Sequence, residues 1–350
     1  MTQPVFDGHN DTLLRLWRSG DLEGRGFLDG SGGHIDWPRA RAGGLMGGFF
    51  AVFVPSARAE GLVSEAADGE VVDEPPLPAV APDEARRATL EIAGILFSLA
   101  RNRPDAIRIC RSVADIEAAE ADGAIAAVFH IEGAEAIGPD LGALEVLHAA
   151  GLRSLGPVWS RSNVFGHGVP FRFPAGPDIG DGLTEAGRNL VRACNRLRIL
   201  VDLSHLNAAG FWEVAKLSDA PLVATHSNAH ALSASSRNLT DDQLRAIRDS
   251  GGVVGLNYAV GFLREDGRKR ADTPLAQMVA HLDHLLGILG EGGVALGSDF
   301  DGALVPEGVG DCAGLPNLVA AMRERGYGET LVQRICRDNW LDVLRRTWGN

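Results

Sequence analysis

Short apolar runs alternate along the chain with longer stretches in which apolar residues recur every three or four positions. The runs are rich in Val, Ile, Leu and Phe and have the length of buried strands. The intervening stretches have helical periodicity, as in residues 83–102, 184–197 and 240–251. Strands that alternate with helices form parallel sheets, and eight such units predict a (β/α)8 TIM-type barrel, with an open doubly wound sheet as the alternative. The eight runs cover residues 5–10, 44–54, 124–131, 152–158, 197–204, 221–225, 252–258 and 293–298.

Polar residues and glycines mark where the predicted helices begin and end. Thr184 and Thr240 are suited to cap helix N-termini, and an acidic residue follows each of them in the first turn. Gly251 and Gly290 stand where helices are expected to stop. These signals support the helix boundaries that the periodicity predicts.

Two segments depart from the strand–helix rhythm. Residues 56–82 are acidic and proline-rich and predict a long exposed loop after the second strand. Residues 159–182 are rich in glycine and proline and follow the fourth strand. Both loops are expected to overhang the carboxyl ends of the strands, where loops shape the substrate pocket. Since no repeat or linker divides the chain, we expect residues 1–350 to form a single domain.

The composition, 45% hydrophobic and 23% charged, is ordinary for a globular protein. A net charge of −13, with Lys216 and Lys269 as the only lysines, argues against a nucleic-acid surface. We expect neither a signal peptide nor a membrane span, because no basic stretch precedes a long apolar segment. Scattered cysteines without a C-x-x-C motif indicate reduced thiols and a cytoplasmic protein, and a homo-oligomer is compatible with the sequence. The cysteines are Cys110, Cys194, Cys312 and Cys336.

Side chains able to bind metal or move protons stand where the apolar runs end. The carboxyl ends of parallel strands gather at one face, so these side chains are expected to converge. Residues two apart on a strand point the same way, which lets His9 and Asp11 reach one metal together. An H-x-D pair, two further imidazoles and a glutamate suit a two-metal hydrolytic site. The metal ligands predicted in this way are His9, Asp11, Glu132, His205 and His226.

Each of these residues also has an ordinary explanation. His9 can be a buried histidine bonded to Asp11, Glu132 a capping or surface acid, and His205 and His226 satisfied core or loop histidines. Their common position at strand ends favours the metal site, because several independent accidents of this kind are improbable.

A catalytic acid is predicted from the GSDFDG segment. Asp299 and Asp301 share a face, and Asp299 is favoured because it directly ends the apolar run, whereas Asp301 is expected to brace the turn. His130 shares a face with Glu132 and is interpreted as a core residue or one that lies behind the ligands. The HLDHLL segment that begins at His281 is interpreted as one face of an amphipathic helix.

These residues, in this order, resemble the membrane (renal-type) dipeptidase family, peptidase family M19, within the amidohydrolase superfamily of metal-dependent barrels. The resemblance runs through nearly the whole chain. Its most specific segments are DGHNDT (7–12), IEGAE (131–135), VDLSH (201–205), THSNAHALSASSRNLTDDQL (225–244) and GSDFDG (297–302).

The resemblance implies two zinc ions per chain. His9 and Asp11 would hold one ion and His205 and His226 the other, with Glu132 bridging both. The bridging carboxylate takes the place of the carboxylated lysine of some related barrels, and neither lysine of this chain ends a strand.

The resemblance also implies that Arg237, in an S-x-R-N-type segment, binds the terminal carboxylate of the substrate. A planar guanidinium fork suits a bidentate contact with a carboxylate. A salt bridge from Arg237 to Asp241 or Asp242 is the alternative.

One position departs from the family pattern. The family places a histidine at the end of the fourth strand, thought to contact the scissile carbonyl or the tetrahedral intermediate, whereas this chain has Trp159. Indole donates one hydrogen bond but carries neither a proton nor a positive charge in catalysis. Three explanations stay open: Trp159 donates that bond, His167 or Arg161 enters the site from the following loop, or the substrate differs.

The resulting hypothesis is a zinc-dependent dipeptidase that hydrolyses the amide bond of a dipeptide with a metal-bridging hydroxide, while Asp299 transfers the proton to the leaving amine. One alternative is another amidohydrolase activity, on an N-acyl amino acid, cyclic amide or lactone. A non-catalytic metal-binding homologue is a second, supported only by Trp159. A nicotinamide oxidoreductase has poor support, since GGLMGGFF is no G-x-G-x-x-G motif.

Overall fold

Each of the eight apolar runs contains a strand, and the strands pair in parallel in a computed structural model that describes residues 2–30, 32–55 and 77–349. Residues 56–76, most of the loop predicted at 56–82, lie outside the described residues. A further short strand, β3 (Ile107–Ile109), was not predicted, because an IRI tripeptide is too short to stand out as an apolar run. The eight strands that correspond to the runs are β1 (Val5–Asn10), β2 (Leu45–Phe53), β4 (Ile125–Glu132), β5 (Leu152–Gly156), β6 (Leu200–Val201), β7 (Val223–Ala224), β8 (Val253–Leu256) and β9 (Val294–Leu296).

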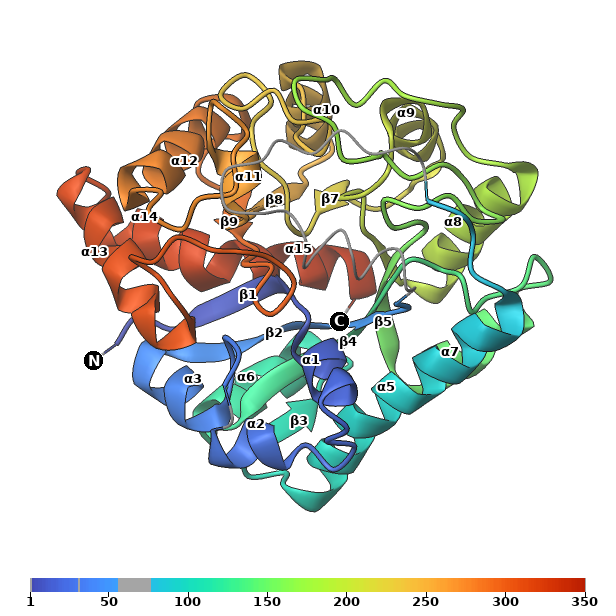
Figure 1. Cartoon of the computed structure of the whole chain (residues 1–350), viewed down its shortest axis with the longest axis horizontal. Coiled ribbons are helices and arrows are strands. Elements are labelled where there is room, and N and C mark those ends of the chain that lie inside the picture. Colours follow the sequence, from blue (N-terminus) through green and yellow to red (C-terminus); the bar gives the residue numbers. More distant parts are fainter. Residues whose placement is uncertain (1, 31, 56–76, 350) are drawn as a thin grey trace.

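The strands form a curled parallel arrangement with helices outside it (Figure 1). Hydrogen bonds order one sheet as β1-β2-β4-β5-β6 and a second as β7-β8-β9. Strand β2 pairs with β4 along one edge, while β3 and β5 share the other edge, β3 at the amino half and β5 at the carboxyl half. Single parallel bridges lie between the two sheets, joining Asp202 to Val223 and Asn10 to Phe300.

The helices follow the predicted pattern, and the two predicted N-caps form as expected. The Thr184 hydroxyl accepts from the amide of Gly187, and Thr240 forms a capping box with Gln243. The two predicted stops, Gly251 and Gly290, both have positive φ, which glycine adopts without strain. The helices are α1 (Thr12–Arg18), α2 (Arg25–Asp29), α3 (Trp37–Gly43), α5 (Pro82–Asn102), α6 (Val113–Ala121), α7 (Gly142–Ala150), α8 (Glu185–Leu197), α9 (Ala208–Leu217), α10 (Asp241–Asp249), α11 (Val260–Leu263), α12 (Leu275–Leu289), a 3-10 turn (Cys312–Gly314), α13 (Leu315–Glu324), α14 (Glu329–Gln333), a π-helical turn (Arg334–Asp338) and α15 (Asn339–Trp348).

Strand β4 illustrates how the chain divides its core from its site. Phe129 and Ile131 belong to the large apolar core shared with the outer helices. Val128, on the opposite face, belongs to a second apolar cluster that includes Phe6, Phe49 and Trp340. Further along that face, His130 and Glu132 replace the apolar residues. One face of the strand is therefore apolar at its amino end and polar at its carboxyl end.

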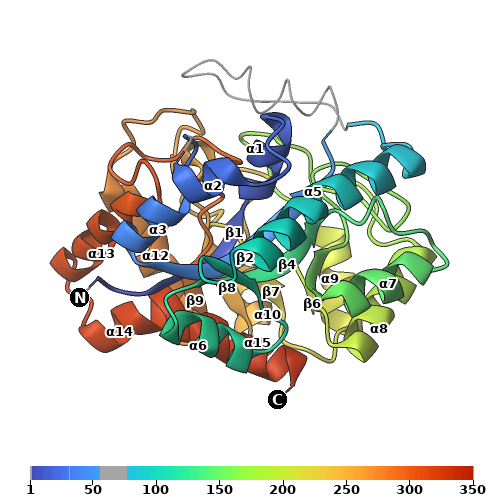
Figure 2. The same ribbon diagram turned by 90° about the horizontal axis from the view of Figure 1, so that it is seen from below.

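Helix α15 covers the amino ends of the strands, at the end of the molecule opposite to α1 (Figure 2). Its Trp340 is fully buried, and the indole N–H donates to the carbonyl of Leu296 at 2.9 Å. Within the ranges that the structure describes, no helix combines the length and the hydropathy needed to cross a membrane.

Candidate metal centre

The six side chains predicted at strand ends come together at the carboxyl ends of the strands. His9 and Glu132 belong to β1 and β4, and Asp11 directly follows β1. His205, His226 and Asp299 lie in the loops after β6, β7 and β9. The parallel topology therefore gathers residues from five strand ends, as expected for this class of fold.

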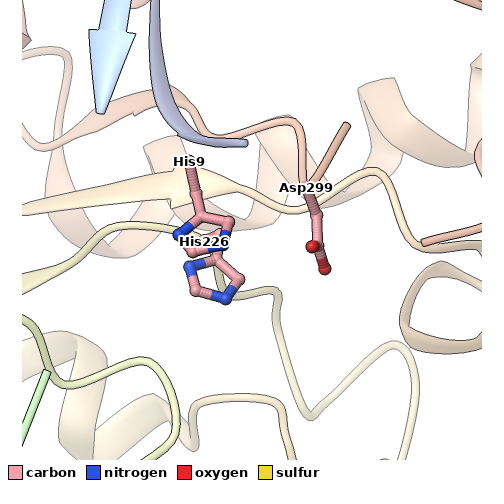
Figure 3. Close-up of side chains that lie close together, drawn as sticks. All are labelled: His9, His226 and Asp299. Atoms are coloured by element: carbon pink, nitrogen blue, oxygen red, sulfur yellow. The ribbon is translucent and has the colours of Figure 1, made fainter. Parts of the chain in front are cut away.

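Glu132 lies at the centre of the group. Its Oε1 is 2.9 Å from His205 Nε2, 3.4 Å from His226 Nε2 and 3.7 Å from His9 Nε2. His9 Nε2 is also 3.5 Å from Asp11 Oδ2. The rings of His9 and His226 stack with centroids 3.9 Å apart, and the Asp299 carboxylate lies beside this pair (Figure 3).

Several polar atoms in this cluster are buried without a hydrogen-bond partner among the described residues. They include both ring nitrogens of His9 and Oδ1 of Asp11. Buried polar atoms are normally paired, and leaving one unpaired costs about 1–3 kcal/mol. Within 4.8 Å of one another lie ligand atoms of His9, Asp11 and Glu132, and likewise those of Glu132, His205 and His226. A third such group joins His9 and His226 to Asp299. This donor set fits divalent cations that accept nitrogen and oxygen ligands.

Hydroxyl groups orient two of the imidazoles. Thr225 donates its hydroxyl proton to Asp202 Oδ2 at 2.6 Å, so its oxygen accepts from His226 Nδ1 at 2.8 Å. His226 Nε2 therefore presents a lone pair to the cluster. Ser160 Oγ lies 2.8 Å from His205 Nδ1, which leaves Nε2 of His205 facing the same point. Such outer contacts fix the ring orientation of metal-binding histidines.

The electrostatics of the cluster call for added positive charge. Burial lowers the pKa of His205 and of His226 well below the usual value, so both rings are neutral, as ligation requires. Burial also acts to lower the pKa of His9, but Glu132, Asp11 and Asp299 outweigh it and raise that pKa to about 10. Three carboxylates thus favour a proton on the His9 imidazole. A bound cation can supply that charge instead.

Asp299 is held at the edge of the cluster by its backbone and by an amide. Its φ is 60°, its N–H donates to the carbonyl of His9 at 3.0 Å, and Asn257 Nδ2 donates to Oδ2 at 2.9 Å. Burial raises the pKa of this carboxyl group. Asp301 points elsewhere, since its oxygens accept from the amide of His34 at 2.6 Å and from Arg15 Nε at 3.1 Å.

A cavity of about 310 Å³ opens above the cluster. Trp159 lines it, and its ring lies 5.7 Å from that of His205. Arg161 instead lies behind this wall, where it pairs with Glu135 at 2.9 Å. His167 is not among the described residues that line the cavity, and its Nδ1 is 3.3 Å from Ser162 Oγ. Of the three side chains considered for this position, the structure brings only Trp159 into the cavity.

Arg237 is buried beside the ligand cluster. Its Nη2 lies 3.2 Å from His205 Nε2 and donates to the carbonyl of His226 at 3.1 Å, while Nη1 donates to the carbonyl of Ser204. Its Nε has no hydrogen-bond partner in the part of the chain that is described. The alternative salt bridges do not form: Asp241 pairs with His284 and Asp242 with Arg245.

Two polar residues of the site were not predicted. Asp202 orders the loop after β6 by accepting from the Ser204 hydroxyl at 2.7 Å and from the Thr225 amide at 2.9 Å. Asn257 holds Asp299. Asp202 directly follows β6 and Asn257 directly follows β8, but both fall inside the apolar runs as predicted, so the rule that selected the predicted ligands passed over them.

The remaining histidines lie outside the ligand groups. His130 Nδ1 is 2.9 Å from Ser154 Oγ, and its ring lies 5.6 Å from that of His9, behind the cluster. His281, in α12, is buried between the carbonyl of Leu263 and the amide of Ala229. The HLDHLL segment is a helix face, as predicted.

Comparison with known proteins settles the family. Residues 1–348 match the family model described as membrane dipeptidase, peptidase family M19. The chain belongs to peptidase family M19. This membership confirms the predicted function class, a metal-dependent dipeptidase and therefore a hydrolase.

Solved structures of this M19 member's relatives agree closely with it. A metallo peptidase from Rhodobacter sphaeroides, liganded with a phosphinate mimic of the dipeptide L-Ala-D-Ala, is 53% identical with a TM-score of 0.97, over 99% of this chain and 100% of that one. A second M19 structure, dipeptidase AC, is 53% identical with a TM-score of 0.96, over the full length of both chains. An uncharacterised protein of the pqqA 5' region of Klebsiella pneumoniae is 50% identical over 254 residues, 73% of this chain and 94% of its own length.

Proposed function

We propose that the protein hydrolyses the peptide bond of dipeptides at a centre of two zinc ions. The observation that carries this proposal is the convergence of five buried ligand side chains, several atoms of which lack a partner. His9 and Asp11 would hold one ion and His205 and His226 the other, with Glu132 between them. Two of the three groups of potential ligands correspond to this division.

When bound, the zinc ions would lower the pKa of a water molecule toward neutrality and polarise the scissile carbonyl. The remaining steps fall to the chain itself. Asp299 takes the proton of the attacking water and passes it to the leaving amine. The hydrogen bond from its backbone N–H to the His9 carbonyl and the one that its Oδ2 accepts from Asn257 keep the carboxylate beside the cluster. The raised pKa of Asp299 suits a group that must both accept and release a proton.

Arg237 is the proposed anchor of the substrate's terminal carboxylate. Its guanidinium lies next to His205, and its unpartnered Nε offers a donor that a carboxylate would satisfy. Only a substrate with a free carboxylate one residue from the scissile bond can use this anchor, which favours dipeptides over longer peptides.

Trp159 would contact the substrate from the cavity wall. An indole N–H can donate one hydrogen bond to the scissile carbonyl, but it adds no positive charge to the transition state. Positive charge for the developing oxyanion would then be supplied by the metal ions, because Arg237 is assigned to the terminal carboxylate.

The test is hydrolysis of a substrate panel by metal-replete protein and by protein treated with a chelator. Dipeptides, N-acyl amino acids, cyclic amides and lactones would be compared in one assay. We expect cleavage of dipeptides, loss of activity after chelation and its return with zinc. Preferred cleavage of a substrate that lacks a free terminal carboxylate would contradict the proposal.

We also propose that the eight strands β1, β2 and β4–β9 close into a barrel. The single bridges from Asp202 to Val223 and from Asn10 to Phe300 support closure. A Cβ atom at Gly8 would lie 2.2 Å from the carbonyl oxygen of Thr225, so segments of the two sheets approach closely across the interior.

A cytoplasmic location is proposed on the state of the cysteines. All four are buried and unpaired, and burial raises the pKa of each thiol to about 12. Free thiols that are kept reduced are typical of cytoplasmic proteins.

A further inference from the structure

The charged residues that line the cavity fall into two sets. The acidic ones, Asp11, Glu132 and Asp299, all belong to the ligand cluster or lie beside it. Apart from His205, the other charged residues in the described lining are cations: Arg18, Arg172 and Lys269. In a chain with 46 acidic and 33 basic residues, of which only two are lysines, this segregation is a feature of the cavity and not of the surface as a whole.

Two of these cations lie near Arg237, the proposed carboxylate anchor. Arg172 is tied to the segment of Arg237 by a pair of hydrogen bonds, because its amide donates to Ser236 Oγ and its carbonyl accepts from the amide of Ser236, both at 3.0 Å. Lys269 passes close to α11, since a Cβ atom at Gly261 would lie 3.5 Å from its Cγ. The Arg172 backbone and the stem of Lys269 therefore lie beside the segments that carry Arg237 and Phe262.

Two aromatic rings of the cavity lining connect Arg237 with the predicted ligand His205. Phe171 and Phe262 stack with centroids 6.1 Å apart, and the Arg237 guanidinium lies 5.6 Å from the Phe262 ring. Phe171 also contacts the ring of His205 at 6.3 Å. A substrate residue bound at Arg237 would thus lay its side-chain stem on an apolar wall and extend its end toward the cations.

We infer that the preferred substrates are dipeptides whose C-terminal residue carries an anionic side chain, aspartate or glutamate, paired with Arg172 and Lys269. This inference rests on the proposed function, and in particular on Arg237 as the carboxylate anchor. The apolar wall lowers the local dielectric and strengthens a charge-assisted bond to the side-chain carboxylate.

The expected preference is moderate. Both cations already interact with other groups of the protein, so an anionic side chain would exchange one partner for another. Partly exposed ion pairs contribute little each, and two together correspond to a preference of about tenfold.

The test compares Ala-Glu with Ala-Gln, each with an L or a D C-terminal residue, using metal-replete full-length protein. The two side chains have the same shape and differ in charge, so the ratio of their kcat/KM values isolates the charge. We expect a ratio of about ten that falls at high salt, because salt screens the pairing. Lys269→Gln and Arg172→Gln should each lower the ratio, and the double variant should bring it close to one.

Lys216→Gln is the matched control, because it removes the chain's other lysine from an exposed site on α9. This variant should leave the Glu-to-Gln ratio unchanged. A wild-type ratio of one or less, with Ala-Gln cleaved well, would overturn the inference and leave the proposed dipeptidase function intact. Failure to cleave any dipeptide would overturn the proposed function itself. If Arg172→Gln does not fold, the Lys269→Gln variant and the salt dependence still decide.

Discussion

The two ends of the strand arrangement are built from the same strands but meet opposite demands. At the amino end, Phe6, Phe49 and Val128 pack against Trp340, whose N–H is satisfied by a carbonyl. At the carboxyl end, His9 and its neighbours are equally buried, yet several of their polar atoms have no partner within the described chain. The amino end is complete by itself, whereas the carboxyl end needs a ligand to complete it.

We expect the amino end to contribute mainly to folding stability and the carboxyl end mainly to metal binding and catalysis. Apolar burial at the amino end contributes free energy of folding in proportion to its area. Burial of a charged cluster at the carboxyl end costs free energy until a cation pairs with it. Changes at one end should therefore affect unfolding, and changes at the other should affect turnover and metal affinity.

The largest effect is expected from Asp299→Asn at the carboxyl end. This change keeps the shape of the side chain but removes the proposed proton acceptor, so kcat should fall by about 10²- to 10⁴-fold. Zinc content and melting temperature should stay close to those of the wild type. Full activity in a zinc-loaded Asp299→Asn protein would remove Asp299 from the mechanism.

The opposite change is Trp340→Ala at the amino end. Truncation of a fully buried tryptophan should cost about 3–5 kcal/mol of unfolding free energy. Urea denaturation of the metal-loaded wild type and variant measures this loss of unfolding free energy. Activity per folded molecule should be retained.

Trp212→Ala is the matched control for this variant. Trp212 is 38% exposed, so its loss should change stability by less than about 1 kcal/mol. An equal loss of unfolding free energy in both variants would mean that the buried amino-end cluster contributes no more to stability than an exposed tryptophan does.

Arg237→Ala tests whether the carboxyl end also selects the substrate. Removal of a buried partner of a charged group costs about 2–5 kcal/mol, which corresponds to a loss of about 30- to 4,000-fold in kcat/KM for a dipeptide. The amide of the same dipeptide, which has no terminal carboxylate, should be affected much less. Parallel losses on the two substrates would argue against the anchoring role.

A fourth prediction concerns His281, a buried histidine outside the candidate metal centre, and the dependence of stability on pH. His281 bridges two backbone groups, and burial lowers its pKa from 6.5 to about 4. His281 is therefore protonated below about pH 6.5 in the unfolded chain, but only below about pH 4 in the folded chain. Stability from this residue is present above pH 6.5 and is lost as the pH falls toward 4, by about 2 kcal/mol between pH 7 and pH 5.

Urea titrations of the wild type and of His281→Gln at both pH values measure this contribution. The variant should lose about 2 kcal/mol less than the wild type over the same interval. Identical pH dependence in the two proteins would show that His281 does not couple folding to protonation.

Much of this arrangement could be predicted from the sequence, because the strands follow apolar runs and the ligands follow the strand ends. His205 and His226 are 21 residues apart in the chain, yet their Nε2 atoms lie 3.1 Å apart. Parallel topology alone predicts that approach. Strand β3 was missed because its pairing depends on the edge of β4 that β5 leaves open, which a three-residue pattern does not reveal.

The cavity wall could not be predicted in the same way. Phe171 and Phe262 lie in segments without strand periodicity, and their stacking depends on how the loop after β5 meets the short helix α11. The choice among Trp159, Arg161 and His167 likewise depended on which side of a loop faces the cavity. Loop conformation is determined by tertiary contacts that the hydrophobic pattern does not encode.

The central claim is that five distant side chains form one centre for two zinc ions. Its most direct test is the zinc content of the purified protein, combined with anomalous diffraction at the zinc edge, for the wild type and for Glu132→Ala. The account predicts about two zinc ions per wild-type chain, on either side of Glu132, and a marked loss of both in the variant. A folded wild-type protein that takes up no zinc, or that binds it away from Glu132, would contradict the account.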